Sequence, residues 1–411
     1  PGAQGEDPPA KGRVLPNAGK LTNSIRTLPY EQVANEEATD GYALYPKSRV
    51  TSPHSPVVVR QDGPSGPRYQ EAVGYTFLIN SVKFPGLARM DDGLLVLTLS
   101  MEIKEESKRV GLLLFSKDEG RTWSQPRRIP VHRTKPIALD GKKLLLGNLL
   151  SDDAGQTWSE LKPLPSRGPD GRIIHISDLA YTPLVEAGDV TFVGWTPLEG
   201  YARWKSGELF TQGVLWRFHP DTQTWDEPYY FPKSRALNEG SLTRAKNGDL
   251  IAAFRTQMIG VPIDSDHWMG LATMRSTDEG KTWSEPAHHF LYGAHHCNLL
   301  TLPDGRILMT YAARIGELEG RTYHGVEAVF SHDHGAHWDW RRRYILFRWP
   351  NQGPHSPQSV ALSDGRILTV FMHDTQYSWT DSDRHPYVDK VNLAFVGNVS
   401  VVIWSSPLTE R

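Results

Sequence analysis

Basic, acidic and imidazole side chains recur at a fixed distance before a series of Asp-Gly and Asn-Gly dipeptides in this sequence. Carboxylates and imidazoles perform general acid–base catalysis, and lysine and arginine bind anionic groups. The pattern therefore predicts a polar binding or catalytic site that is assembled from several repeats. The residues stand nine or ten positions before the glycine, and they are Lys83, Glu239, His295, His296, His355 and Ser356.

Two of the repeats are less regular. Lys135 stands only six residues before Gly141, and His175 and Asp178 are the expected counterparts in the third repeat. We expect these three side chains to bind substrate together with those of the other repeats. Solvated charges without a function are the alternative reading for any single member.

Glu239 is the principal candidate for catalysis. It lies directly before an apolar strand whose return ends at Arg255, so both side chains are expected at one end of the same strand pair. A carboxylate beside guanidinium groups stays ionised, and it can orient a hydroxyl or accept its proton. Arginine binds a carboxylate or sulfate through two parallel hydrogen bonds. This makes Arg255, Arg314 and Arg321 candidates for holding an anionic substrate.

Several histidines near one point can also bind a metal ion. Zinc sites are usually marked by closely spaced ligands, and the sequence contains no such motif. Neutral histidines that bond to the backbone are the commoner case. We therefore expect no metal and no other cofactor.

The elements that position these residues are short strands. Each turn is followed by an apolar run, and Asp-Gly or Asn-Gly between apolar runs is typical of β-hairpins. No segment has a sustained helical periodicity. The turns are Asp92-Gly93, Asp140-Gly141, Asn247-Gly248, Asp304-Gly305 and Asp364-Gly365.

An octet of the form S-x-D-x-G-x-T-W also repeats along the chain. Its glycine supplies a backbone position with φ > 0, its aspartate accepts hydrogen bonds within its own turn, and its tryptophan packs under the hairpin. We predict that it joins two outer strands and that its aspartates are neither catalytic nor metal-binding. The copies are Ser116–Trp123, Ser151–Trp158, Ser276–Trp283 and Ser331–Trp338, with a worn copy at Phe218–Trp225.

Six such units predict an all-β fold, a six-bladed β-propeller, in which the innermost strands line a channel and begin at one mouth. A β-sandwich or a seven-bladed ring that uses residues 26–80 is the alternative. We expect residues 1–25 to form a flexible tail and residues 26–411 a single catalytic domain. A strand at Val57–Val59 is expected to close the ring against Val399–Trp404. The units are residues 83–134, 135–172, 173–235, 236–292, 293–352 and 353–405.

Composition excludes several other classes of protein. The formal net charge is −2 and no Lys/Arg cluster stands out, which argues against nucleic acid as a partner. The apolar runs are too short to span a bilayer.

The single cysteine, Cys297, excludes disulfides within the chain, and it is expected to be a buried apolar residue. The first residue is proline, and we expect a secreted or periplasmic protein whose signal peptide has been removed.

The octets and the candidate site together resemble the sialidase superfamily, six-bladed propellers with Asp-box hairpins (BNR repeats), over residues 80–405. The resemblance implies a triad of arginines for the sugar carboxylate, a Tyr nucleophile paired with a Glu, and an Asp acid. Glu239 is similar to that Glu and Arg255 to the second arginine. Arg321 is the best-placed match for the third arginine, with Arg314 as the runner-up.

The sequence departs from the family pattern at three of these places. Lys83 replaces the first arginine. The loop of the Asp acid holds only glutamates, among them Glu105 and Glu106, and His355-Ser356-Pro357 stands where the Tyr is expected. These departures indicate the family scaffold with a non-standard active site.

We therefore expect an exo-acting glycosidase for an anionic or polar terminal sugar of a glycan. Lys83, Arg255 and Arg321 are expected to bind the substrate. Glu239, with His296 or His355, is expected to transfer protons, and Glu105 or Glu106 to act as a second carboxylate. The alternatives are a His/Lys-dependent lyase or atypical hydrolase of uronate-containing glycans, and a non-catalytic carbohydrate-binding propeller. The sequence does not predict the oligomeric state.

Overall fold

The computed structural model describes eleven stretches of the chain, and all of their regular structure is β-strand. Within these stretches no helix is long and apolar enough to cross a membrane. Residues 1–56, which include the predicted tail, lie outside them. The described residues are 57–77, 82–103, 108–131, 134–176, 182–198, 210–235, 237–257, 269–318, 321–349, 355–374 and 397–406.

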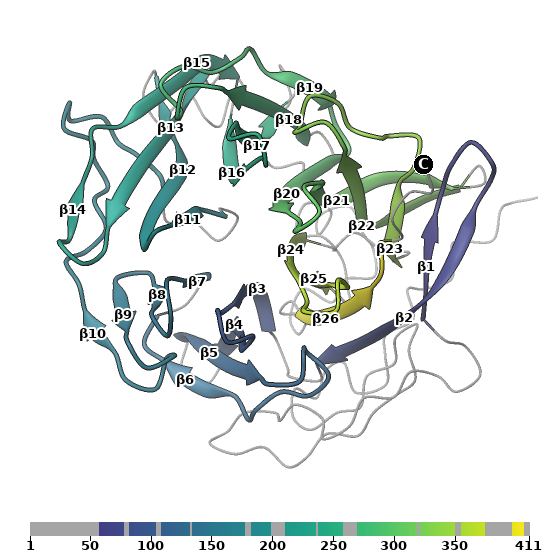
Figure 1. Cartoon of the computed structure of the whole chain (residues 1–411), viewed down its shortest axis with the longest axis horizontal. Helices are drawn as coiled ribbons and strands as arrows, with labels where there is room; N and C mark the ends of the chain where they lie inside the picture. Colours follow the sequence, from purple (N-terminus) through teal and green to yellow (C-terminus); the bar gives the residue numbers. More distant parts are fainter. Residues whose placement is uncertain are drawn as a thin grey trace, which may run out of the picture.

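The strands form six antiparallel blades around a central channel, a six-bladed β-propeller (Figure 1). The first blade is β3 (Val82–Arg89), β4 (Leu95–Ile103), β5 (Lys108–Ser116) and β6 (Arg127–Ile129). The second is β7 (Pro136–Ala138), β8 (Leu144–Leu146), β9 (Leu149–Ser151) and β10 (Ser159–Glu160). The third is β11 (Leu184–Glu186), β12 (Asp189–Pro197), β13 (Phe210–His219), β14 (Thr224–Trp225) and β15 (Tyr229–Arg235).

The other three blades follow the same order, from the channel outward. The fourth is β16 (Asn238–Arg244), β17 (Leu250–Gln257), β18 (Met269–Ser276) and β19 (Ala287–Phe290). The fifth is β20 (Ala294–Thr301), β21 (Ile307–Leu318), β22 (Arg321–Ser331) and β23 (Tyr344–Trp349). The sixth is β24 (His355–Ala361), β25 (Ile367–Asp374), β26 (Gly397–Trp404) and, from the N-terminal side, β2 (Arg68–Phe77). The predicted six units are confirmed, and the sandwich and the seven-bladed ring are wrong.

The ring is closed by β2 rather than by the predicted strand at Val57–Val59. β2 pairs with β26 from Val73–Ile403 to Phe77–Val399. β1 (Val57–Gln61) instead pairs with β2 and, through Arg60 and Ile345, with β23 of the fifth blade. It therefore links two blades at their outer edge (Figure 1).

Aromatic side chains explain why β2 takes the closing position. Tyr75 and Phe77 are buried against the first blade. The indole Nε1 of Trp123 donates a hydrogen bond of 2.6 Å to the Tyr75 hydroxyl, and the Phe77 and Trp123 rings meet edge to face at 5.9 Å. Burying three large rings favours this strand over the shorter β1, which carries no aromatic residue.

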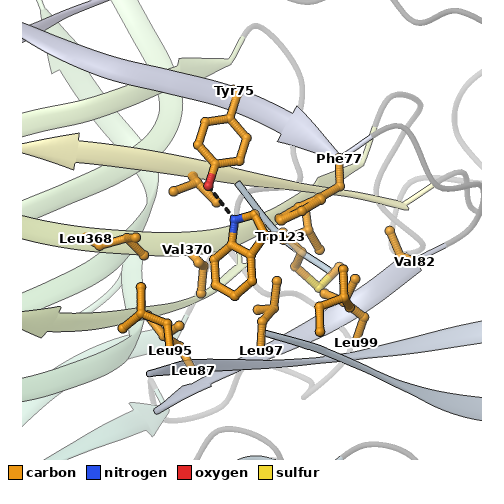
Figure 2. Close-up of a cluster of buried hydrophobic side chains, with 14 of the residues drawn as sticks. Tyr75, Phe77, Val82, Leu87, Leu95, Leu97, Leu99, Trp123, Leu368 and Val370 are labelled. Carbon is orange, nitrogen blue, oxygen red and sulfur yellow. Dashed lines mark hydrogen bonds between the residues drawn. The ribbon is translucent and has the colours of Figure 1, made fainter. Parts of the chain in front are cut away.

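The core between the first and sixth blades is built from the apolar strand runs (Figure 2). Leu95, Leu97 and Leu99 of β4 face Leu368 and Val370 of β25, and all five are at most 1% exposed. Each such side chain contributes about 1.5–3 kcal/mol through burial. Blade-to-blade packing of this kind fixes the inner strands, and therefore the channel mouth.

The repeated octets form structural turns between the third and fourth strands of a blade, as predicted. In the first copy, Asp118 accepts hydrogen bonds from the Thr122 amide at 2.8 Å and hydroxyl at 2.6 Å. The Gly120 amide donates to Ser116 Oγ at 2.8 Å, and its φ is +80°. Glu119 before it also has positive φ. The copies at Ser151, Ser276 and Ser331 repeat the serine and aspartate contacts.

Candidate functional site at one mouth of the channel

Four of the six inner strands begin with the same irregularity. In β3, β16, β20 and β24 two residues of the inner strand stand opposite one residue of the second strand, which is a β-bulge. The first bulge residue lies nine positions before the turn glycine, and the second is buried in each case. The first bulge residues are Phe84, Glu239, His296 and Ser356.

Each of these four residues adopts a left-handed backbone conformation that is normally left to glycine. The φ angles are +56° for Phe84, +46° for Glu239, +52° for His296 and +47° for Ser356. A non-glycine residue in this region costs about 1–2 kcal/mol. Strain of this kind is typical of functional sites, because it persists only where the surrounding structure imposes it. In the fourth and fifth blades the bulges bring the Glu239 and His296 side chains into contact.

Glu239 meets its two closest partners at this position. Its Oε2 atom lies 3.0 Å from Arg255 Nη1 and 2.9 Å from His296 Nε2. Both contacts are bent, so they act as ion pairs more than as hydrogen bonds of regular geometry. Arg255 is held in turn by Asn238, whose Oδ1 accepts from Arg255 Nε at 2.8 Å. The fourth and fifth blades are thereby joined at the mouth.

The charges around Glu239 keep its carboxyl ionised. Burial alone raises its pKa, but the positive charge of Arg255 and the contact with His296 outweigh burial. Lys135, from the second blade, adds a further positive charge, and the pKa falls to about 2. Glu239 is therefore a carboxylate at neutral pH, able to orient or accept a proton but not to donate one.

Arg314 connects the remaining histidines. Its Nε donates to His295 Nε2 at 3.1 Å, and its Nη2 lies 2.8 Å from His355 Nε2. The His296 ring centroid is 4.1 Å from that of His295 and 5.2 Å from that of His355. Arg314 is 1% exposed and His295 0%. Burial, then the nearby cations, lowers the pKa of His295 well below its usual value, so this ring is neutral.

The ring nitrogens that face away from these partners are buried and unpaired. His295 Nδ1 and His296 Nδ1 have no hydrogen-bond partner within the described part of the chain. An unpaired buried polar atom costs about 1–3 kcal/mol. Such atoms in a strained cluster indicate a site that is completed by a ligand.

A metal ion fits this cluster poorly. One ligand atom each from Glu239, His295 and His296 lies within 4.8 Å of the others, so the spacing alone would allow it. However, His295 Nε2 accepts a hydrogen bond from Arg314 Nε–H, which places the ring proton of neutral His295 on Nδ1 and leaves no lone pair for a metal. Lys135 and Arg255 also repel a cation at Glu239. The donor set suits an anion and a hydroxyl better than a metal.

The predicted site residues divide into those that the structure brings together and those that it does not. Glu239, Arg255, His295, His296, Arg314 and His355 form one cluster, with Lys135 acting on Glu239. Ser356 is the buried bulge residue beside His355. Lys83 takes the corresponding place in β3, opposite Ser100, but its side chain lies outside what is described.

The remaining predicted residues lie away from the cluster or outside the described residues. Arg321 begins β22 opposite Leu318, beyond the bulge that carries Arg314, and its side chain is not described. His175 stacks on Trp195 of its own blade at 4.2 Å. Glu105, Glu106 and Asp178 lie outside the described residues.

Two residues of the mouth escaped the sequence reasoning. Asn238 positions Arg255, and Phe84 is the bulge residue of β3. The spacing contains a signal for both, since Phe84 stands nine and Asn238 ten residues before its turn glycine. Their neutral side chains gave no reason to select them.

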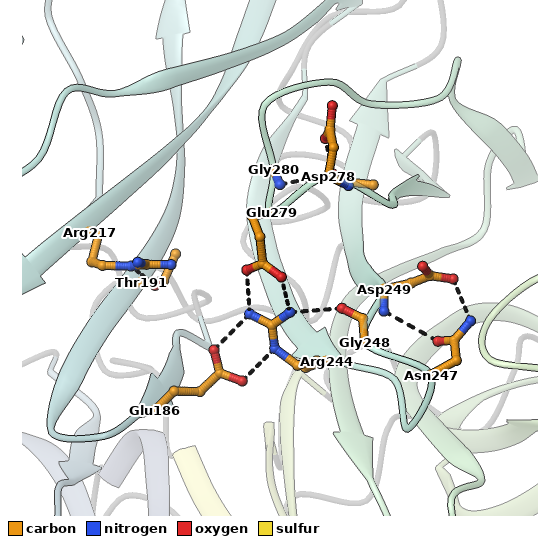
Figure 3. A network of polar contacts seen from close by, with 11 residues as sticks. Glu186, Thr191, Arg217, Arg244, Asn247, Gly248, Asp249, Asp278, Glu279 and Gly280 are labelled. Carbon is orange, nitrogen blue, oxygen red and sulfur yellow. Dashed lines mark hydrogen bonds and ion pairs between the residues drawn. The ribbon is translucent and has the colours of Figure 1, made fainter.

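Below the cluster the channel holds a cavity of about 570 Å³. Lys135 lines it at the upper end, and Thr182, Asn298 and Gln358 line its middle. At the far end Arg244 binds two carboxylates, those of Glu186 and Glu279 (Figure 3). Glu239, His296 and His355 do not line this cavity, so the cluster forms a separate site above it.

No protein-family model and no curated protein matches the chain, but several solved structures are similar to it. A protein of unknown function from Dyadobacter fermentans is 17% identical with a TM-score of 0.55, and the match covers 79% of this chain and 95% of that one. The NanB sialidase of Streptococcus pneumoniae is 13% identical with a TM-score of 0.51, covering 79% of this chain and 68% of that one.

The fold is that of the sialidase-like β-propellers. The resemblance indicated by the sequence is thereby confirmed for the architecture. The sialidase of Trypanosoma rangeli also matches, at 14% identity and a TM-score of 0.46, and this chain spans 60% of its length. At these identities the likeness between the sialidase-like propellers concerns the fold alone, and the chemistry must be argued from the cluster.

Proposed function

We propose that this protein is an exo-acting glycoside hydrolase that releases an anionic or otherwise polar terminal sugar from a glycan. The observation that supports this most is the position of the Glu239 carboxylate between Arg255 and His296 at the channel mouth. The comparisons support a glycosidase scaffold, because NanB, which shares the fold, is a sialidase. We assign the repeated octets to the Asp-box, or BNR, hairpins of that superfamily.

The charge balance of the cluster favours an anionic substrate. Lys135 and Arg255 act on the Glu239 carboxylate, and Arg314, which bonds to His295, adds a third positive charge to the cluster. Arg255 contacts Asn238 through Nε and Glu239 through Nη1. A guanidinium has five N–H donors, so these two contacts leave donors for a substrate carboxylate or sulfate. Lys83, at the corresponding position of β3, would add a further cation.

Glu239 and His296 would perform the proton transfer. A carboxylate 2.9 Å from an imidazole nitrogen fixes the ring orientation and stabilises the imidazolium that forms when the ring takes a proton. The proposed active site differs from the family pattern, with His355 and Ser356 where the resemblance implies the Tyr nucleophile. Arg314 bonds to His355.

A screen of glycans ending in sialic acid, uronic acid or deoxy sugars, read by mass spectrometry, tests the proposal. We expect release of one anionic terminal sugar with the mass of one added water. Glu239→Gln should abolish release while binding of the same glycan persists. Unchanged turnover in Glu239→Gln and in His355→Ala would exclude this site, and binding without turnover by the wild type would indicate a non-catalytic propeller.

Elimination is a second candidate, and the unpaired His296 Nδ1 favours it. An imidazole nitrogen of this kind can take a proton from the carbon next to a uronate carboxylate while Arg255 neutralises that carboxylate. The product would be an unsaturated sugar that absorbs in the ultraviolet and contains no added water. The same mass spectra therefore distinguish the two reactions.

A further inference from the structure

The protonation of the two neighbouring histidines can be read from their partners. Arg314 Nε always donates, so His295 Nε2 accepts, and the proton of this neutral ring is on Nδ1. His296 Nε2 lies 2.9 Å from the Glu239 carboxylate, and two lone pairs at that distance would repel, so a neutral His296 carries its proton on Nε2 and a lone pair on Nδ1. One ring therefore offers an unpaired N–H donor and the other an unpaired acceptor.

This pair of atoms is complementary to a single O–H group. The two rings are 4.1 Å apart between centroids, and both side chains are at least nine-tenths buried. A water oxygen can accept from His295 Nδ1–H while one of its hydrogens is donated to His296 Nδ1. Both buried nitrogens are then satisfied, which removes the cost of leaving them unpaired.

We propose that His295 and His296 hold and activate the water that attacks the anomeric carbon, so that hydrolysis is a single displacement with inversion. This inference rests on the proposed function and concerns the same site. His296 is its catalytic base, and His295 is a positioning residue for the water.

The step balances with the groups present and water. A proton of the water passes to His296 Nδ1, and the water oxygen bonds to the anomeric carbon. The bond from that carbon to the glycosidic oxygen breaks, and its electron pair stays on the leaving oxygen. An aryl leaving group departs as the phenolate, and a sugar leaving group takes up a proton from solvent. The imidazolium is stabilised by the Glu239 carboxylate.

The positions of the other groups agree with a direct attack by water. The resemblance to the sialidases implies a Tyr nucleophile before the sixth inner strand. This chain has His355 at that position, with its ring against Arg314 Nη2. Glu239 is occupied by Arg255 and His296. The unpaired Nδ1 atoms of His295 and His296 are therefore better suited than either of these groups to position a nucleophile.

The tautomers provide a test that does not depend on activity. In the protein labelled with ¹⁵N-histidine, two-bond nitrogen–proton NMR spectra distinguish Nδ1–H from Nε2–H rings, with His295→Gln and His296→Gln used for assignment. We expect His295 as the Nδ1–H tautomer and His296 protonated at Nε2. A His295 ring protonated at Nε2 alone, or a His296 ring that carries a proton on Nδ1 at neutral pH, overturns the proposal.

The stereochemistry tests the reaction itself. Early in the hydrolysis of 4-nitrophenyl α-sialoside and 4-nitrophenyl β-glucuronide, proton NMR shows which anomer is released first. Inversion is expected, and retention overturns this inference while leaving the hydrolase function intact. If no glycan or aryl glycoside is cleaved, the proposed function fails. The tautomer measurement then tests only whether His295 and His296 can bind a water molecule.

His296→Gly is the sharpest variant. The positive φ of residue 296 suits glycine, so this variant should stay folded while losing the base. We expect turnover to fall about 10²–10⁴-fold and azide to restore it, with a glycosyl azide of inverted configuration as product. His289→Gln, in a half-buried histidine bonded to Thr273, is the matched control and should keep wild-type turnover. Wild-type rates in His296→Gly, or an azide product of retained configuration, would contradict the proposal.

Discussion

The two ends of β16 each hold an arginine–glutamate contact, and the two contacts differ in how completely they are satisfied. At the far end of the channel, the five N–H groups of Arg244 bond to Glu186, Glu279 and the Gly248 carbonyl (Figure 3). At the mouth, Glu239 shares its carboxylate between Arg255 and His296.

The charge balance differs as well. Arg244 faces two carboxylates, whose hydrogen bonds raise its pKa, so that end carries no surplus of positive charge. At the mouth Lys135, Arg255 and Arg314 accompany a single carboxylate, that of Glu239, and two imidazole nitrogens are unpaired within the described residues. The comparison indicates that a saturated polar network holds blades together, whereas an unsaturated one, kept in place by strained bulges, binds a ligand.

The largest expected effect is a loss of activity that distinguishes Glu239, at the mouth, from Glu186, at the far end of the channel. Glu239→Gln removes the charge that stabilises the His296 imidazolium, and we expect kcat/KM to fall by about 10³-fold or more. Glu186→Gln should leave kcat/KM within twofold and lower the melting temperature. Steady-state kinetics and thermal melting of both variants check this. Equal losses of activity in the two variants would show that the two ends do not differ in role.

The second prediction concerns acid pH. The folded-state pKa of Glu239 is about 2, against an ordinary value of 4.5, and the difference corresponds to roughly 3 kcal/mol of stability. Because the folded pKa is depressed, this stability is present above pH 4.5 and is lost as the pH falls toward 2. Urea unfolding between pH 2 and 7 should show a steeper loss for the wild type than for Glu239→Gln. Parallel curves for the two proteins would refute the depressed pKa.

A third prediction distinguishes the two arginines. Arg255→Lys keeps the charge but loses the planar fork, so KM for an anionic glycan should rise about tenfold with a smaller change in kcat. Arg244→Lys should leave KM unchanged and lower the melting temperature, because a lysine cannot bond two carboxylates in the same way. An unchanged KM in Arg255→Lys would remove this residue from the substrate site.

The smallest effect is expected at the outer edge of the third blade. Hydrogen bonds to Asp226 and Asp189 raise the pKa of His219. Since the folded pKa is raised, the contribution is present below the unfolded value of 6.5 and is lost as the pH rises through the folded value. The melting temperature of the wild type should therefore fall relative to His219→Asn above that pH, with no change in turnover. A constant difference from pH 5 to 9 would contradict this.

The architecture could be predicted because its signals are local. The octets and the Asp-Gly turns each encode one hairpin, and six hairpin pairs define six blades. Ring closure could not be predicted from the same signals. The Val57–Val59 run is more apolar than the alternating Arg68–Phe77 segment, but Tyr75 and Phe77 find their partner, Trp123, only in the folded ring.

The candidate site was partly predictable for the same reason. The bulge stands at a constant distance from the turn, so counting back from the glycine finds Glu239 and His296. Counting cannot show that Arg314 lies against His295 and His355, because that contact joins the fifth and sixth blades. Nor can it show that His175 stacks on Trp195.

The central claim is that the mouth cluster recognises a terminal sugar by the negative charge of that sugar and then cleaves it from the glycan. The most direct measurement is kcat/KM for one anionic terminal glycan and for its carboxylate methyl ester, with wild type and Arg255→Lys. We expect the wild type to prefer the free acid about tenfold or more and Arg255→Lys to lose most of this preference. Equal cleavage of acid and ester by the wild type would contradict the account.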